Sequence, residues 1–167
     1  MSSCDDSFLI ELLKKRYAGH DTANFGAADF LAAFGCPADA AMYVSLFWPA
    51  FIRFEGMVFR KATVEDEDDR RRIREALRRS GGDRLGTEKS FNLVEVPCGI
   101  FSRGATETND EVDRFLVETL VEMWKCRLGL VFPESEFVVE AVPPEENAGE
   151  WGVTFYTLAV RRSPART

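Results

Sequence analysis

The sequence predicts an α+β fold in which helices pack mainly on one face of an antiparallel sheet of four or five strands. Apolar residues recur at spacings of three and four between residues 112 and 128, which is typical of an amphipathic helix. β-Branched and aromatic runs separated by turn residues occur within 51–60 and 136–160, which is typical of hairpins. With 167 residues, 46% of them hydrophobic, the chain can bury one core. We therefore expect a single domain over residues 1–160 and a disordered tail over 161–167.

The first third of the chain predicts three short helices and then a hairpin. The first helix is expected to be capped within residues 5–7 and to end near Arg16, and the second is expected over 27–34, stopped by Gly35. The third is expected to begin at Pro37 and to run to about residue 47, before Pro49. Two apolar-rich runs then flank Glu55-Gly56, and this pattern indicates a β-hairpin over 51–60.

Residues 65–79 predict a surface helix, because five acidic residues precede six arginines and few apolar residues are present. Acidic and basic residues four positions apart are expected to pair across one turn. These pairs are Asp66 with Arg70, Glu67 with Arg71, and Asp68 with Arg72. The glycine-rich segment from Ser80 to Gly86 is interpreted as the end of this helix and a turn.

The second half predicts a strand over 93–96, a polar loop over 102–109 and a long helix over 112–128. Strands follow over 136–142 and 151–160, joined by a long loop over 143–149. In the last strand, Trp151, Val153 and Phe155 share one face, whereas Thr154 and Tyr156 share the other.

Negative charge is concentrated between residues 105 and 150. This segment holds twelve acidic and three basic residues, so its net charge of −9 exceeds the −7 of the whole chain. Such a surface attracts basic partners and repels nucleic acid and anionic membranes. We expect no nucleic-acid partner and no membrane partner. The acidic N-terminus lacks the pattern of a secretory signal, and no apolar run is long enough to span a membrane, which predicts a cytoplasmic protein.

The sequence offers little conventional chemistry. The four cysteines lie far apart and His20 is the one histidine, so neither a metal site nor a disulfide is expected, and the thiols are predicted to be reduced and mostly buried. Phosphate-binding, dinucleotide-binding and hydrolase motifs are absent, so no cofactor is predicted. His20 lies between Gly19 and Asp21 and is interpreted as a solvated turn residue.

Two groups of residues nevertheless keep an enzymatic alternative open. Cys98 follows a predicted strand in Pro97-Cys98-Gly99, although the nearby Glu95 disfavours a thiolate. Glu95, Glu136 and Glu140 all lie on predicted strands, and two carboxylates a few ångströms apart would support acid and base catalysis. Alternating solvent-facing acids on a sheet would give the same pattern.

Aromatic residues are dense between Tyr43 and Phe59, and core packing between a helix and the hairpin is the favoured explanation. A ligand pocket or an exposed patch is the alternative. If a patch exists, Trp48 beside Pro49 is the expected binding anchor, because tryptophan is enriched at binding hot spots.

A resemblance to a known family covers about two thirds of the chain and rests on two segments. The segments are Leu46-Phe47-Trp48-Pro49 with Phe51 and Gly56, and Phe132-Pro133 through Phe137 to Phe155. The chain resembles a family of small bacterial cytosolic proteins of uncharacterised function. The matching positions are aromatic residues, prolines and glycines that determine a fold, so the resemblance implies an α+β domain and supplies no active site.

An interaction protein is therefore expected rather than an enzyme. The hypothesis is an immunity or antitoxin-like domain that binds a basic protein through its acidic face. A small-molecule enzyme using carboxylates or Cys98 is one alternative, and a structural subunit of an assembly is another. The predicted binding residues are Glu118, Glu122, Glu145, Glu146, Glu150 and Trp48.

Overall fold

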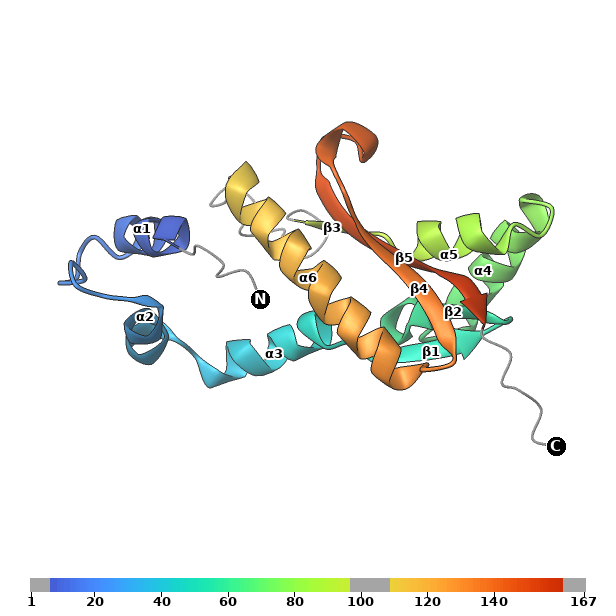
Figure 1. Ribbon diagram of the computed structural model, residues 1–167, viewed down its shortest axis with the longest axis horizontal. Helices are drawn as coiled ribbons and strands as arrows, with labels where there is room; N and C mark the ends of the chain where they lie inside the picture. Colours follow the sequence, from blue (N-terminus) through green and yellow to red (C-terminus); the bar gives the residue numbers. More distant parts are fainter. Residues whose placement is uncertain (1–6, 97–108, 161–167) are drawn as a thin grey trace. The chain divides into compact units, whose positions relative to one another are not determined.

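The computed structural model describes residues 7–96 and 109–160, and it has an α+β architecture (Figure 1). Cys98, most of the predicted loop over 102–109 and the predicted tail over 161–167 lie outside the described residues. The elements are α1 (Ser7–Arg16), α2 (Ala27–Phe34), α3 (Pro37–Phe47), β1 (Phe51–Phe54), β2 (Met57–Arg60), η1 (Lys61–Thr63), α4 (Glu67–Arg79), α5 (Arg84–Asn92), β3 (Val94–Val96), α6 (Asp110–Val131), β4 (Ser135–Val142), η3 (Pro144–Glu146) and β5 (Trp151–Val160).

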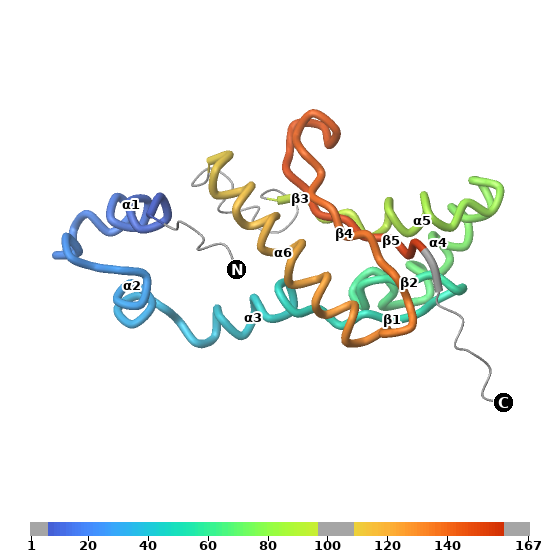
Figure 2. Tube along the Cα trace, in the orientation of Figure 1, coloured from blue at the N-terminus to red at the C-terminus, as the bar shows by residue number. Residues whose placement is uncertain are grey.

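The chain divides into two compact units, Met1–Tyr43 and Val44–Thr167, with the boundary inside α3. Figure 2 follows the Cα trace through both. We call them the N-terminal unit and the C-terminal unit. The prediction of a single domain over residues 1–160 stays a prediction.

The N-terminal unit is small and is held together by aromatic rings. Tyr17, at the end of α1, stacks on Phe34 of α2 with 3.9 Å between ring centroids. Phe25 and Phe30 meet edge to face at 5.3 Å. Among the described residues of this unit, only Thr22 and Phe30 are buried, so it buries little apolar surface.

The helices and the first hairpin predicted from the sequence are confirmed with few changes of boundary. In the hairpin, Phe54 pairs with Met57, and the turn residues Glu55 and Gly56 have φ values of 52° and 76°. Two consecutive positive φ values are typical of the two-residue turn that matches the twist of a hairpin. The long helix is longer than expected, because α6 continues through Gly129 to Val131.

The prediction of four or five strands in one sheet needs correction. The five strands of the described residues form two antiparallel sheets, β1-β2 and β3-β5-β4. The backbone edges of β2 and β5 do not pair with each other. Two side chains of α5 occupy the place where a ladder would lie, as described below.

The main core of the C-terminal unit lies between α6 and the three-stranded sheet, and the β1-β2 hairpin contributes Phe51 and Val58 to it. Trp124, which is fully buried, contacts Phe51 and Phe155 edge to face and donates an indole hydrogen bond to the Leu46 carbonyl at 2.8 Å. Val153 also faces this core, as the strand alternation predicts.

The opposite face of the sheet is also covered, so helices do not pack on one face alone. Thr154 is fully buried, and its hydroxyl donates to the Lys89 carbonyl of α5 at 2.6 Å. Lys89 forms an ion pair with Glu140 on that same face at 2.7 Å. Figure 1 shows α6 and α5 on opposite sides of β4 and β5.

A second apolar cluster joins the first hairpin to α4. It consists of Met57, Phe59, Val64 and Ile73, all almost fully buried. Arg70, Arg71 and Arg72 each pair with the acid three residues before them rather than with the predicted acid four before, as in Asp68 with Arg71 at 2.9 Å. Asp66 does not pair with Arg70, because its carboxylate caps the helix by accepting from the Asp69 amide.

Helix α5 was not predicted from the sequence, and it provides the polar link between the two sheets. Buried Glu88 accepts hydrogen bonds from the Val58 amide at 2.5 Å, the Thr157 amide at 2.7 Å and the Thr157 hydroxyl at 2.8 Å. One turn later, Asn92 accepts from the Arg60 amide and donates to the carbonyls of Val58 and Phe155. We call Glu88 and Asn92 the α5 bridge, because they satisfy the facing edges of β2 and β5.

Candidate functional site

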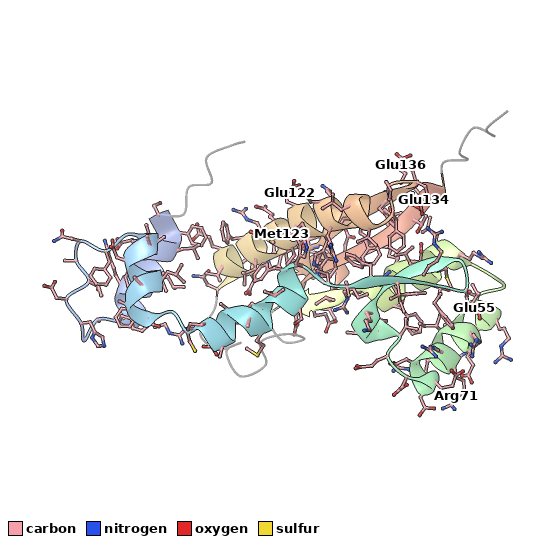
Figure 3. The ribbon with its side chains drawn as sticks, turned by 90° about the horizontal axis from the view of Figure 1, so that it is seen from below. Glu55, Arg71, Glu122, Met123, Glu134 and Glu136 are labelled. Carbon is pink, nitrogen blue, oxygen red and sulfur yellow. The ribbon has the colours of Figure 1, made fainter. Side chains whose placement is uncertain are left out.

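The predicted binding residues on α6 lie on its exposed side. Glu118 and Glu122 are exposed. Leu120, which lies between them in the sequence, and Trp124, two residues after Glu122, are buried. Figure 3 shows Glu122 projecting away from the sheet. Arg114 lies 3.9 Å from Glu118 and Lys125 lies 3.4 Å from Glu122, and all four side chains are solvated. Solvated pairs of this kind neutralise little of the field that a distant partner meets.

The remaining predicted acids lie at the turn between β4 and β5. Glu145 and Glu146 are exposed on η3. Glu150 is half-buried, and its Oε2 atom is buried with no hydrogen-bond partner. An unpaired carboxylate oxygen removed from water is unfavourable, so this position favours a cationic or hydrogen-bonding neighbour.

The start of α6 brings two more acids to this end of the C-terminal unit. The indole of Trp151 donates to the Asp110 carboxylate at 2.5 Å, which ties the end of the turn to the beginning of α6. Asp110 and Glu111 are both exposed. They were not among the predicted binding residues, because their proximity to the turn depends on this long-range contact. We call Asp110, Glu111, Glu118, Glu122, Glu145, Glu146 and Glu150 the acidic surface.

Trp48 is not an exposed anchor. Its ring is half-buried beneath the guanidinium of Arg127, which lies 5.5 Å from the ring centroid. Arg127 also donates to the Pro49 carbonyl at 3.4 Å. These contacts give Trp48 a packing role within the C-terminal unit, in line with the interpretation that the aromatic residues before the hairpin serve the core.

The strand carboxylates do not form a catalytic pair. Glu136 and Glu140 are four residues apart on β4, a separation of about 13 Å along a strand. Glu95 lies on β3, with β5 between it and β4. Glu140 is already engaged by Lys89, and the hydrogen bond between them raises the pKa of Lys89.

The predictions for the cysteines are confirmed only in part, and the prediction for His20 is confirmed. Cys36 and Cys126 are free, as expected, but both are exposed rather than buried. Cys126 lies on the solvent side of α6, next to Lys125 in the sequence. His20 is exposed in a turn, as predicted, with its ring 5.1 Å from that of Phe34. Within the described ranges, no three histidine, cysteine or acidic residues gather as metal ligands would.

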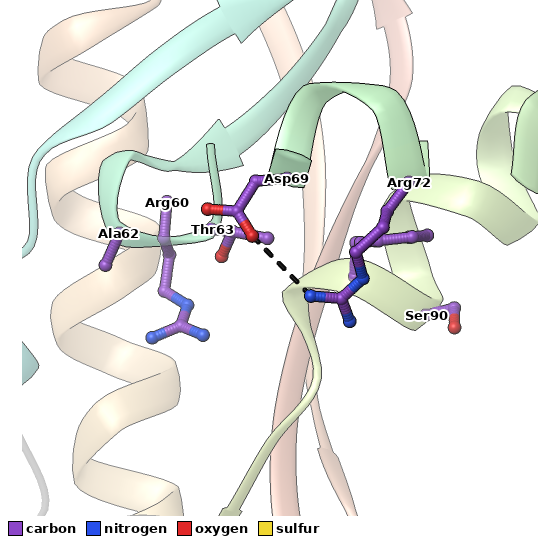
Figure 4. A pocket seen from close by; sticks show the side chains of 7 residues that line it. Arg60, Ala62, Thr63, Asp69, Arg72 and Ser90 are labelled. Carbon is purple, nitrogen blue, oxygen red and sulfur yellow. Dashed lines mark ion pairs between the residues drawn. The ribbon is translucent and has the colours of Figure 1, made fainter. Parts of the chain in front are cut away.

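A different feature, which the sequence did not indicate, is a recess of about 410 Å³ lined by η1, α4 and α5 (Figure 4). We call it the Arg60 recess, and its polar lining residues are Arg60, Thr63, Asp69, Arg72 and Ser90. A second hollow of about 290 Å³ shares Arg60 and Ala62 with it. Arg60 therefore lies between two open spaces at the end of β2.

Two polar atoms of the Arg60 recess are buried without a hydrogen-bond partner among residues 7–96 and 109–160: Nε of Arg60 and the hydroxyl oxygen of Thr63. The Arg60 side chain also has no ion pair among the described residues, although its guanidinium lies 5.6 Å from the centroid of the Trp124 ring. By contrast, Arg72 pairs with Asp69 at 3.5 Å, as the dashed line in Figure 4 shows.

The partly buried position of Arg60 makes its positive charge unfavourable. Burial lowers the pKa of Arg60 to about 10. A base whose pKa is lower in the folded state than in the unfolded state destabilises the fold at every pH below the folded value. That cost is relieved only as pH rises through about 10, where the folded protein releases the proton first. At neutral pH, Arg60 is a half-buried cation whose guanidinium lies near an aromatic face and has no ion pair among the described residues.

No protein family, curated protein or solved structure matches the chain. The resemblance to a bacterial family therefore stays a prediction. Among the helices of the described residues, none combines the length and the apolar character needed to cross a membrane.

Proposed function

We propose that the C-terminal unit is a protein-interaction domain, which binds a basic protein partner through the acidic surface. The observation that carries the proposal is the exposure of acidic side chains on both α6 and the β4–β5 turn, tied together by the Trp151–Asp110 hydrogen bond. Glu111, Glu118 and Glu122 are seven and four residues apart, so they lie along one side of α6.

The charge of this surface is suited to guiding association. Residues 109–150 carry eleven acidic and three basic residues, and Asp113 is the one acid among them that is fully buried. A concentrated field of one sign raises the rate at which an oppositely charged partner arrives, and it acts beyond contact distance when salt is low. This charge favours a partner with a basic surface. In an interaction of the immunity or antitoxin type, this protein would be the inhibitor and would occlude that basic surface.

The two alternatives are a small-molecule enzyme and a structural subunit. The separation of Glu95, Glu136 and Glu140 removes the support for paired-carboxylate chemistry. Cys98 lies outside the described residues, so a role for its thiol stays a prediction, as does the subunit hypothesis.

The test begins with capture of partners on the immobilised protein at low ionic strength, followed by elution with rising salt. The purified partner is then used in stopped-flow association experiments. We expect a basic partner, and we expect the substitutions Glu145→Gln, Glu146→Gln and Glu150→Gln together to slow association several-fold at low salt and little at high salt.

A matched variant carries the same change in net charge elsewhere. Glu11→Gln, Asp21→Asn and Asp39→Asn alter three exposed acids of the N-terminal unit. This variant should associate at nearly the original rate. A partner without net positive charge, an association rate indifferent to salt, or equal slowing by both triple variants would contradict the proposal.

A further inference from the structure

Arg60 has an arrangement that the fold does not require. It is the last residue of β2, and its amide already bonds Asn92 in the α5 bridge. Its side chain extends from that fixed backbone toward the recess, where Nε is buried without a partner. Neighbouring arginines of α4, including Arg71 and Arg72, pair with acids one turn away. Arg60 alone among these three forms no ion pair with an acid of the described residues, although Asp69 and Glu65 line the hollows on either side of it.

A buried cation without an anion is unfavourable, because water is removed and no opposite charge replaces it. The Trp124 ring compensates only in part, since the attraction of a cation to an aromatic ring is weaker than that to an anion. Groups held in such an unfavourable state are concentrated at binding sites, where a ligand supplies the missing interaction.

Apart from the carboxylate of Asp69, the other polar groups of the recess can also donate hydrogen bonds. Thr63 has a buried hydroxyl without a partner, and Ser90 of α5 adds a second hydroxyl to the lining. Arg72 adds a second guanidinium, and the carboxylate of Asp69 is occupied by Arg72 and by the Glu65 amide at 3.2 Å. Figure 4 shows the side chains of Arg60 and Arg72 reaching the same space from different elements.

We propose that the Arg60 recess binds the phosphate group of a small phosphorylated compound, with Arg60 as its principal cationic ligand and Arg72, Thr63 and Ser90 as further donors. A phosphate offers acceptor oxygens in several directions, which suits donors that come from β2, η1, α4 and α5. A carboxylate offers two oxygens in one plane and would leave part of this donor set unused.

The size and charge of the recess favour a small molecule over a nucleic acid. Its volume of about 410 Å³ is within the range of small-molecule sites. The surrounding surface is not basic, since Glu65, Asp68 and Asp69 lie on or beside α4 and the chain has a net charge of −7. This site is independent of the acidic surface, so the two proposals succeed or fail separately.

The first experiment follows the Nε–H signal of Arg60 by NMR during titration of the full chain with inorganic phosphate at constant ionic strength. The signal is assigned from the Arg60→Lys variant. We expect a saturable shift of this signal with phosphate, at concentrations where acetate and chloride cause none. An unmoved Arg60 signal, or an equal response to acetate, would overturn the proposal.

The second experiment introduces a carboxylate beside Arg60 by substitution, so that it competes with phosphate. Ala62 is exposed on η1 and lines both hollows beside Arg60, so substitution there should not disturb the core. Ala62→Asp supplies a carboxylate to Arg60, and Ala62→Asn supplies nearly the same shape without charge. We expect phosphate affinity to fall about tenfold in Ala62→Asp and to change less than about twofold in Ala62→Asn. Equal effects of the two variants would contradict the site.

The third experiment removes the cation. Arg60→Met should abolish the phosphate response while its urea midpoint stays equal to that of the original protein or rises, because an unpaired buried charge is lost. A folded Arg60→Met protein that still binds phosphate would overturn the assignment of Arg60. If this variant does not fold, the Ala62 pair decides the question.

Discussion

At the scale of single residues, Glu88 is the side chain on which the fold depends most clearly. It is 2% exposed, and each of its three hydrogen-bond partners is a donor. A carboxylate suits this position because it accepts only, whereas an amide would turn an N–H group toward other N–H groups.

We therefore predict that Glu88→Gln lowers the free energy of unfolding by about 2 to 4 kcal/mol, since it leaves buried donors unsatisfied. Thr157→Val is the control, because it removes one hydroxyl donor and keeps the amide bonds, and it should cost about 1 kcal/mol. Urea denaturation followed by circular dichroism measures both. A loss below about 1 kcal/mol in Glu88→Gln would contradict the role given to this carboxylate.

The roles of Glu88 and Arg60 could not be predicted from the sequence. Glu88 accepts hydrogen bonds from residues 30 and 69 positions away in the sequence. Arg60 stands out because its buried Nε has no hydrogen-bond partner among the described residues, which only the three-dimensional structure shows. A glutamate next to a lysine is ordinarily solvated, and an arginine at the end of a strand is ordinarily paired or exposed. Exposure of Glu118 and Glu122, by contrast, followed directly from helical spacing.

At the scale of elements, α6 has two faces with opposite environments. Leu120 is 1% exposed and contributes to the main core, whereas Glu122 is exposed two positions later. The sequence predicted this division because the apolar stripe is strong and continuous.

We predict that Leu120→Ala lowers the free energy of unfolding by about 2 to 5 kcal/mol, through lost burial and a residual cavity. Glu122→Ala should lower it by less than about 0.5 kcal/mol, as is usual for an exposed substitution. Chemical denaturation of both variants provides the measurement. Equal losses would show that the faces of α6 are assigned wrongly, and undiminished partner binding by a Glu118→Ala/Glu122→Ala variant would remove α6 from the proposed interface.

Helix α5 shows why a periodicity argument can miss an element. Its buried side chains are Thr87, Glu88 and Asn92, so no apolar stripe marks its inner face. Glycines at 81, 82 and 86 favoured a turn instead. The remaining signal was Asp83, whose carboxylate accepts from the Gly86 amide and caps the helix.

At the scale of the whole molecule, the core is distributed unevenly along the chain. Nearly every buried apolar side chain of the described residues lies in the C-terminal unit, and the N-terminal unit contributes Phe30. This uneven distribution could not be predicted from the sequence, because apolar residues are frequent in both units. The segment from Ala38 to Tyr43 in the N-terminal unit is an example, since its residues are exposed.

We predict that a fragment comprising residues 37–167, which keeps α3 whole, unfolds cooperatively with a urea midpoint close to that of the full chain. The reason is that both apolar clusters lie within it. Loss of the near-ultraviolet circular dichroism signal in this fragment would show that the first helices are needed for the fold. A fragment of residues 1–43 should lack cooperative unfolding, because it buries too little surface.

The α5 bridge has a consequence for how the fold is inherited. A backbone ladder is largely indifferent to the identity of its side chains, so most mutations leave strand pairing in place. Here the polar contacts between the first hairpin and the larger sheet are made by the side chains of Glu88 and Asn92, beside the apolar contact of Phe51 with Phe155. A single codon change can replace either polar side chain. The polar contacts between the two sheets thus depend on two residues. A descendant protein that lost either residue would need other side chains to satisfy the facing edges of β2 and β5.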